Sequence, residues 1–161
     1  MPPNLEVVTN DALGWAVAGE IAEFLRRTAQ DRIVSIALSG GRTPRTVYAA
    51  LADVSDLSWG NVVILQTDER GVPADHPRSN FRLIQSALLN NLHEPPSSVI
   101  RMEAGTGDLT EAATRYEGRL PTSLDLAVLG IGEDGHIASI FPGDESIWAC
   151  DGKVAVSQSP D

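Results

Sequence analysis

A chain of 161 residues with 42% hydrophobic and 21% charged residues has the size and composition of one globular domain with a substantial core. Twelve basic against twenty-two acidic residues give a formal net charge of −10, which repels nucleic acids and anionic membrane surfaces. No apolar run reaches the roughly 20 residues that a membrane-spanning helix needs. We therefore expect a single domain over residues 1–161, with neither a nucleic acid nor a membrane as its partner.

The start of the chain and its cysteine content favour a cytoplasmic protein. The first residues lack the basic patch, apolar stretch and cleavage site of a signal peptide. Cys150 has no second cysteine with which to form a disulfide, as is usual in a reducing compartment. Lys153 is the only lysine, so the other basic residues are arginines, whose planar guanidinium groups suit the recognition of a small anion.

Helix-like and strand-like segments alternate along the chain. Residues 33–38, 62–65 and 124–129 are short and almost wholly apolar, which is typical of strands covered on both faces, and a weaker strand is expected at 99–102. Apolar residues at helical spacing and helix-start signals predict helices over about 10–30, 44–51, 80–89 and 110–120. This alternation predicts an α/β fold, a three-layer α/β/α sandwich with a mainly parallel, Rossmann-like sheet.

Three of the predicted strands lead directly into loops that are rich in glycine or in charged residues. These loops begin at Ser39, Thr67 and Gly130. Ligands of open parallel sheets bind beyond the carboxyl ends of the strands. The three loops are therefore expected to meet at one site.

The first loop, Ser39-Gly40-Gly41-Arg42-Thr43-Pro44, joins a strand to the start of a helix. Its glycines let the backbone approach a ligand closely, the free N–H groups of the helix attract an anion, and Arg42 adds positive charge. The segment is not a Walker phosphate loop, since it lacks the lysine of that motif. A phosphate site and a simple turn capped by Thr43 both fit these residues.

The last loop contains Gly130-Ile-Gly-Glu-Asp-Gly135, a literal match to the glycine pattern of dinucleotide-binding folds. Its two acidic residues stand where a pyrophosphate would lie, and too few residues follow for a full βαβ unit, so a dinucleotide is disfavoured. His136 follows directly. Its position beside Asp134 fits a general base whose imidazole is oriented by a carboxylate, and a histidine that only caps a turn is the alternative.

The middle loop begins with Thr67-Asp68-Glu69-Arg70, which places two carboxylates and a guanidinium directly after a strand. Arg78 lies near the start of the next helix, where its guanidinium and the free backbone donors around Asn80 suit a phosphate. A solvated charge cluster and ordinary helix capping are the alternatives. No Cys/His cluster has the spacing of a zinc site, so no metal site is predicted.

Three segments in series resemble the 6-phosphogluconolactonase family, within the glucosamine-6-phosphate isomerase/deaminase superfamily. They are Leu38-Ser-Gly-Gly-Arg-Thr-Pro44, Thr67-Asp-Glu-Arg70 and Leu129-Gly-Ile-Gly-Glu-Asp-Gly-His-Ile-Ala-Ser-Ile-Phe-Pro-Gly143. The deaminases carry Asp-Glu-Tyr and Phe-Asn-Glu-Pro-Gly where this chain has Arg70 and the Ala138-to-Gly143 segment, so the lactonase branch fits better. Family members continue beyond the point that corresponds to Asp161, and the chain is expected to be C-terminally short relative to them.

The resemblance implies hydrolysis of 6-phospho-D-glucono-1,5-lactone to 6-phospho-D-gluconate, a step of the oxidative pentose phosphate pathway, without a metal or organic cofactor. It implies that His136 is the catalytic base and that Asp68 and Asp134 are orienting groups. The donor to the oxyanion is either an arginine, for which Arg70 is the candidate, or backbone N–H groups of the Gly-rich loop. The residues expected to bind the substrate and its phosphate are Ser39, Gly40, Gly41, Arg42, Arg78, Asn80 and Gly132.

Two other functions fit the same residues less well. One is a catalytically silent protein that binds a sugar phosphate, and the other is an enzyme like the glucosamine-6-phosphate deaminases and isomerases. In each case the expected partner is a small phosphorylated sugar, and the lactone is the first choice. The sequence does not decide between a monomer and a homo-oligomer.

Overall fold

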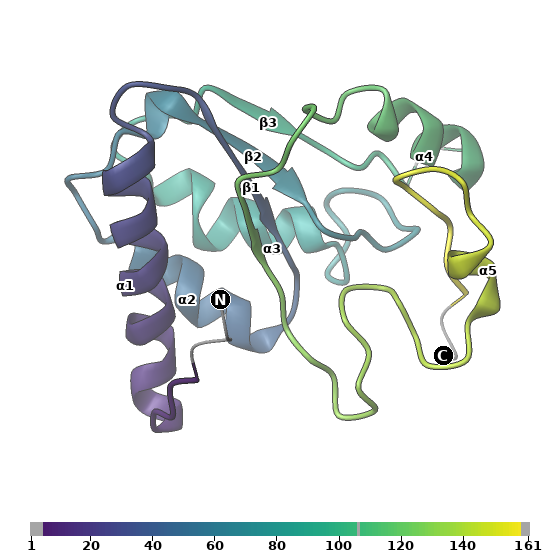
Figure 1. Cartoon of the computed structure of the whole chain (residues 1–161), viewed down its shortest axis with the longest axis horizontal. Helices are drawn as coiled ribbons and strands as arrows, with labels where there is room; N and C mark the ends of the chain where they lie inside the picture. The colour runs from purple at the N-terminus through teal and green to yellow at the C-terminus, as the bar shows by residue number, and fades with distance from the viewer. Residues whose placement is uncertain (1–4, 106, 159–161) are drawn as a thin grey trace.

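A computed structural model describes residues 5–105 and 107–158 of the chain (Figure 1). Its four strands are β1 (Val34–Leu38), β2 (Val62–Gln66), β3 (Ser98–Ile100) and β4 (Leu126–Val128). They form one sheet in the order β3-β2-β1-β4, and every neighbouring pair is parallel. The prediction that the four apolar segments share one mainly parallel sheet is confirmed.

Helices alternate with these strands as the sequence pattern predicts. They are α1 (Asn10–Thr28), α2 (Arg42–Ala52), α3 (Asn80–Ala87), α4 (Leu109–Glu117) and α5 (Glu145–Trp148), with short 3-10 turns at Trp59–Asn61 (η1) and Leu89–Asn91 (η2). The short α5 was not expected. Asp108 begins α4 by accepting hydrogen bonds from the backbone N–H groups of Thr110, at 2.7 Å, and Glu111, at 3.1 Å.

The third strand is shorter than its apolar pattern suggests. The expected strand ran to Met102, whereas β3 ends at Ile100. The backbone N–H of Met102 donates instead to the side-chain oxygen of Gln66, at 2.9 Å. A side chain at the end of β2 therefore takes the hydrogen bond that would have continued the ladder.

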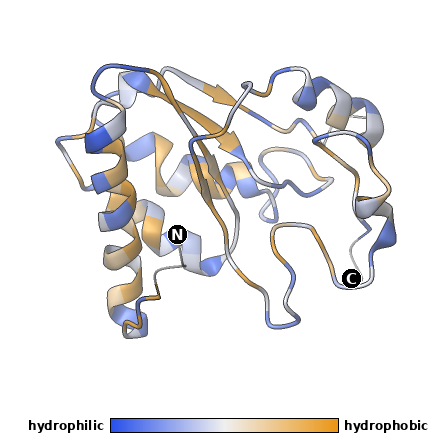
Figure 2. Cartoon of the chain, in the orientation of Figure 1, coloured by the Kyte–Doolittle hydropathy of each residue, from blue (hydrophilic) through white to orange (hydrophobic). Residues whose placement is uncertain are grey.

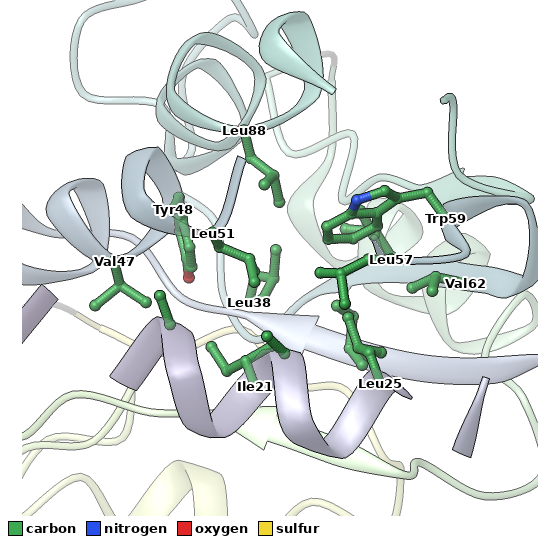
Figure 3. Close-up of a cluster of buried hydrophobic side chains, with 14 of the residues drawn as sticks. Ile21, Leu25, Leu38, Val47, Tyr48, Leu51, Leu57, Trp59, Val62 and Leu88 are labelled. Carbon is green, nitrogen blue, oxygen red and sulfur yellow. The ribbon is translucent and has the colours of Figure 1, made fainter. Parts of the chain in front are cut away.

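One face of the sheet carries the main hydrophobic core (Figure 3). Alternate residues of the two central strands point to this face, and α1, α2 and α3 supply the side chains that pack on them. Fully buried members labelled in Figure 3 are Leu38, Tyr48, Leu51, Trp59, Val62 and Leu88. Burial of this apolar area is the largest stabilising contribution to the fold and holds α2 and α3 at fixed positions beside the sheet.

The opposite face is covered less completely. Tyr116 of α4 anchors this helix to β2, because its hydroxyl donates to the carbonyl oxygen of Gln66 at 2.6 Å. Ala37, Leu65 and Ala127 of the sheet line a cavity of about 630 Å³ together with α4 and residues 147–157. Figure 2 shows that the strands are mainly hydrophobic whereas α4 is mainly hydrophilic. In the described ranges, no helix is long and apolar enough to cross a membrane.

Candidate active site

The loops that follow β1, β2 and β4 lie at the same edge of the sheet, because the three strands are parallel. Two contacts join them. The side chain of Asn80 lies directly against Gly40, in the space that a Cβ atom at Gly40 would need. The hydroxyl of Ser139 donates to Oδ2 of Asp68 at 2.8 Å. These two contacts bring the three segments together at one edge of the sheet, as the sequence predicts.

The loop after β1 leaves polar groups open at the start of α2. Gly41 is the N-cap residue, with φ of 108°, a left-handed conformation that favours glycine. The first turn of α2 contains no acidic residue, and no side chain caps it. Thr43 lies inside the helix, so the alternative of a turn capped by Thr43 is wrong. The backbone donors of this helix start are directed at the loop without a carboxylate to satisfy them.

Ser39 adds an unsatisfied hydroxyl to the same loop. The residue is 4% exposed, and within the described part of the chain its Oγ has no hydrogen-bond partner. Its carbonyl oxygen is held by the hydroxyl of Tyr48, at 2.7 Å, and burial raises the pKa of Tyr48. A buried hydroxyl without a partner costs free energy, which an incoming oxyanion would recover.

The loop after β2 is organised by Glu69, to which the sequence analysis assigned no role of its own. Its carboxylate accepts hydrogen bonds from the backbone N–H groups of Asn80, at 2.7 Å, and Phe81, at 2.9 Å. It also accepts from the side chains of Gln66, at 2.8 Å, and Ser79, at 3.0 Å. The expectation that the backbone donors around Asn80 are free for a phosphate is therefore wrong, because Glu69 already occupies the start of α3.

Asn80 and Asp68 form a buried link between the loops after β1 and β2. Asn80 is 5% exposed, and its side-chain amide donates to the carbonyl oxygen of Asp68 at 3.0 Å. The Asp68 carboxylate is 9% exposed and accepts from Ser139 and from the hydroxyl of Thr67, at 3.1 Å. Asp68 is thus held in one orientation at the point where the three loops meet.

His136 and Asp134 form a direct pair in the loop after β4. Nδ1 of His136 lies 2.6 Å from Oδ1 of Asp134, and the same oxygen accepts the backbone N–H of His136 at 3.2 Å. These contacts, the backbone hydrogen bond first, hold the pKa of Asp134 below its usual range. A neutral imidazole beside this carboxylate carries its proton on Nδ1, which leaves the lone pair of Nε2 available.

Gly132 makes room for this imidazole. A Cβ atom at Gly132 would overlap Cε1 and Nδ1 of His136, and the Gly132 backbone N–H donates to the His136 carbonyl at 2.9 Å. The ring centroid of Phe141 lies 5.0 Å from that of the imidazole, with the two ring planes tilted by 44°. Gly132, expected as a substrate contact, is placed instead where it sets the position of the His136 ring.

The three arginines of the expected site, Arg42, Arg70 and Arg78, are exposed. Arg42 begins α2, and Arg78 stands two residues before α3, close to the contact between Gly40 and Asn80. The backbone N–H of Arg70 donates to Glu69. Among residues 5–105 and 107–158, no three His, Cys, Asp or Glu side chains are grouped as metal ligands.

Comparison with known proteins points to one group. Residues 8–161 match a family model described as glucosamine-6-phosphate isomerases/6-phosphogluconolactonase. The chain is 37% identical to the 6-phosphogluconolactonase of Mesorhizobium japonicum, over 84% of this chain and 58% of that protein. It is 36% identical to that of Synechocystis sp., over 97% of this chain and 70% of that protein. The matched part of the chain thus corresponds to 58% and 70% of the length of these two relatives.

A solved structure agrees with these matches. The 6-phosphogluconolactonase from Shewanella baltica superimposes with a TM-score of 0.81 at 28% sequence identity. The superposition covers 96% of this chain and 68% of that one. The two chains thus share their fold over the part that is superimposed.

Proposed function

The chain belongs to the family of glucosamine-6-phosphate isomerases and 6-phosphogluconolactonases, and on this premise we propose that it hydrolyses 6-phospho-D-glucono-1,5-lactone to 6-phospho-D-gluconate. The reaction breaks one carboxylic ester bond with water. The observation that carries the proposal is the pair formed by His136 and Asp134, at 2.6 Å, in a loop that the bond between Ser139 and Asp68 joins to the loop after β2.

In this mechanism His136 is the general base. A lactone is already an activated ester, so the main task is to deprotonate water near neutral pH, which suits an imidazole. Nε2 of His136 takes the proton as the water oxygen bonds to the lactone carbonyl carbon. Asp134 keeps the Nδ1 proton in place and stabilises the imidazolium that forms. The same proton then passes to the ring oxygen as the carbon–oxygen bond breaks.

The phosphate of the substrate is assigned to the start of α2. The unsatisfied hydroxyl of Ser39, the backbone around Gly40 and Gly41, and the exposed guanidinium of Arg42 all lie there. Arg78, exposed two residues before α3, is the proposed source of a second guanidinium. These local donors offset the repulsion that a protein of net charge −10 exerts on a dianion.

Two further residues complete the proposed site. Asp68, buried where the loops meet, orients the groups around the reacting carbonyl. Arg70, exposed beside it, is the candidate donor to the oxyanion that forms when water adds. Asn80 and Gly132 act by holding the loops and the His136 ring rather than by touching the substrate, as their buried contacts support.

The wider expectations are part of the same proposal. Residues 1–161 are treated as one domain, and a phosphorylated sugar lactone is its small-molecule partner. A metabolic substrate of this kind and the unpaired thiol of Cys150 support a cytoplasmic location.

Lactone hydrolysis by the purified chain, corrected for the spontaneous reaction, tests the proposal. His136→Asn is expected to lower kcat about 100-fold or more with little change in KM, since general base catalysis is lost and binding is not. His93→Asn is the matched control, because His93 is exposed and outside the site. Parental turnover in a folded His136→Asn protein would refute the role of His136.

A second measurement separates catalysis from binding. Arg78→Ala is expected to weaken 6-phosphogluconate binding by about 1.5 kcal/mol, roughly tenfold, the lower end for a charged hydrogen bond because Arg78 is exposed. Calorimetry on parent and variant measures this directly. Binding without turnover in the parent would favour the silent sugar-phosphate-binding protein, and ammonia release from an amino-sugar phosphate would favour the deaminase alternative.

A further inference from the structure

The His136 loop, residues 130–143, is folded on itself. The Gly132 backbone N–H donates to the His136 carbonyl at 2.9 Å, and the Ile140 N–H donates to the Ile137 carbonyl at 3.0 Å. Isolated bridges pair Ile137 with Ile131 and with Ile140. These bonds fix the shape of the loop but not where the loop stands relative to the sheet.

Burial of apolar side chains does not fix that position either. Ile131 is 78% exposed, Ile140 is 41% exposed and Ile137 is 39% exposed. None of the three belongs to the hydrophobic core between the sheet and α1, α2 and α3. The placement of His136 over the site therefore needs a contact of another kind.

Ser139 provides such a contact. Its hydroxyl donates to Oδ2 of Asp68 at 2.8 Å, which joins two residues 71 positions apart in the chain. Asp68 is itself immobilised, because it is 9% exposed and Asn80 holds its carbonyl oxygen. A hydrogen bond to an ionised carboxylate is shorter and stronger than one between neutral groups.

The backbone is bent to make this contact. Ala138 has φ of 53°, and within the described residues it is the one non-glycine with a positive φ. An alanine pays a free-energy cost in the left-handed region, and such conformations persist where surrounding interactions hold them. The turn from Ile137 to Ile140 points Ser139 at Asp68, and His136 directly precedes that turn.

We propose that Ser139 is a positioning residue of the lactonase site, whose bond to Asp68 fixes the distance between His136 and the loops after β1 and β2. The inference rests on the proposed function for its kinetic consequence only. This role requires no contact between Ser139 and the substrate or the reacting water. It acts through Asp68 and the loop backbone, and misplacement of a base by as little as 1 Å is costly to the rate.

The kinetic test compares Ser139→Ala, Ser139→Thr and Asp68→Asn, alone and combined. Ser139→Ala is expected to lower kcat about tenfold or more with KM within about twofold, since the base is displaced while phosphate binding is retained. Ser139→Thr, which keeps the hydroxyl, is expected to restore kcat. Ser139→Ala is expected to cost little further in an Asp68→Asn background, because the bond is already impaired there.

A control and a second readout guard against a purely structural effect. Ser86→Ala removes an exposed hydroxyl that donates to the Leu83 carbonyl in α3, and its kcat is expected to equal that of the parent. Parental kcat in Ser139→Ala, or a loss that Ser139→Thr does not restore, would overturn the proposal. So would fully additive effects of Ser139→Ala and Asp68→Asn on kcat.

Hydrogen exchange decides the matter even if the purified chain has no lactonase activity. Amides of residues 131–143 are expected to exchange about tenfold faster in Ser139→Ala, and unchanged in Ser86→Ala, because the loop loses its bond to the sheet. Absence of turnover in the parent refutes the proposed function alone. Unchanged exchange of this loop in Ser139→Ala refutes the anchoring role of Ser139.

Discussion

Replacement of Glu69 by glutamine is expected to lower the free energy of unfolding markedly, because its carboxylate collects hydrogen bonds from both ends of the loop after β2. The carboxylate lies at the start of α3, where the helix dipole and free N–H groups favour negative charge. One carboxylate oxygen accepts two backbone N–H groups, and the other accepts one backbone N–H and two side chains. Those donors belong to Asn80 and Arg70, and to Phe81, Gln66 and Ser79.

The size of the effect follows from this arrangement. The Glu69→Gln amide can place its NH₂ group at either of the two oxygen positions, and at least two hydrogen-bond donors point to each position. Because the NH₂ group cannot accept these bonds, at least two hydrogen bonds to a charged acceptor are lost. At about 1.5 kcal/mol for each, the free energy of unfolding falls by about 3 kcal/mol. For a chain of this length the melting temperature then falls by roughly 6 to 12 °C.

Urea and thermal unfolding at pH 7 measure this loss. Glu111→Gln is the matched control: the Glu111 side chain is 75% exposed and lies 3.6 Å from Arg115, so its loss is expected to stay below about 0.5 kcal/mol. Equal unfolding free energies of the two variants, within about 1 kcal/mol of the parent, would contradict the capping role of Glu69.

Three further changes test other parts of the fold. Asp125→Asn is expected to cost about 1 to 2 kcal/mol at pH 7. The hydrogen bond from the Arg32 side chain holds the pKa of Asp125 below its usual range, so the parent loses the stabilisation by ionised Asp125 as the pH falls through that pKa. Urea unfolding of parent and variant at pH 7 and at pH 3 measures the cost of the substitution and its pH dependence. Tyr116→Phe removes the hydroxyl between the amide and carbonyl of Gln66. Burial raises the pKa of Tyr116 to about 12, above the value of about 10 in the unfolded chain. The parent is therefore expected to lose stability as the pH rises from about 10 to 12, whereas Tyr116→Phe lacks this loss. Unfolding at pH 8 and at pH 11 measures the difference. Gly40→Ala places a methyl group against the buried first residue of α3 and is expected to lower both the melting temperature and, by calorimetry, the affinity for 6-phosphogluconate.

The sheet was predictable because its signal is local. Each strand is a short apolar run that ends where glycine or charge begins, and the carboxyl ends of parallel strands necessarily share one edge. The pair of His136 and Asp134 was also predictable, since the two residues are only two positions apart in the chain. Burial of the strand residues and the 2.6 Å contact of the pair both follow from that short-range pattern.

The hydrogen-bond partners of the polar side chains could not be predicted from the sequence. Glu69 precedes its two backbone donors in α3 by 11 and 12 residues, and nothing in the intervening loop shows that the chain turns back on itself. Ser139 donates a hydrogen bond to Asp68, which lies 71 positions earlier in the chain. Gly132 was expected to contact a ligand because glycine often does, but the space that it leaves is filled by the His136 ring. These contacts depend on tertiary packing and have no short-range signature.

The contrast between two helix starts explains where an anion is expected to bind. Both α2 and α3 begin at the carboxyl edge of the sheet, and each directs backbone donors there. At α3 the carboxylate of Glu69 already accepts hydrogen bonds from these N–H groups. A phosphate would have to displace this carboxylate and would then be repelled by its negative charge. At α2 no acidic side chain intervenes, Gly41 leaves the approach open, and the Ser39 hydroxyl lacks a partner. The fixed charge of Glu69 therefore favours the start of α2 over the start of α3 as the phosphate site.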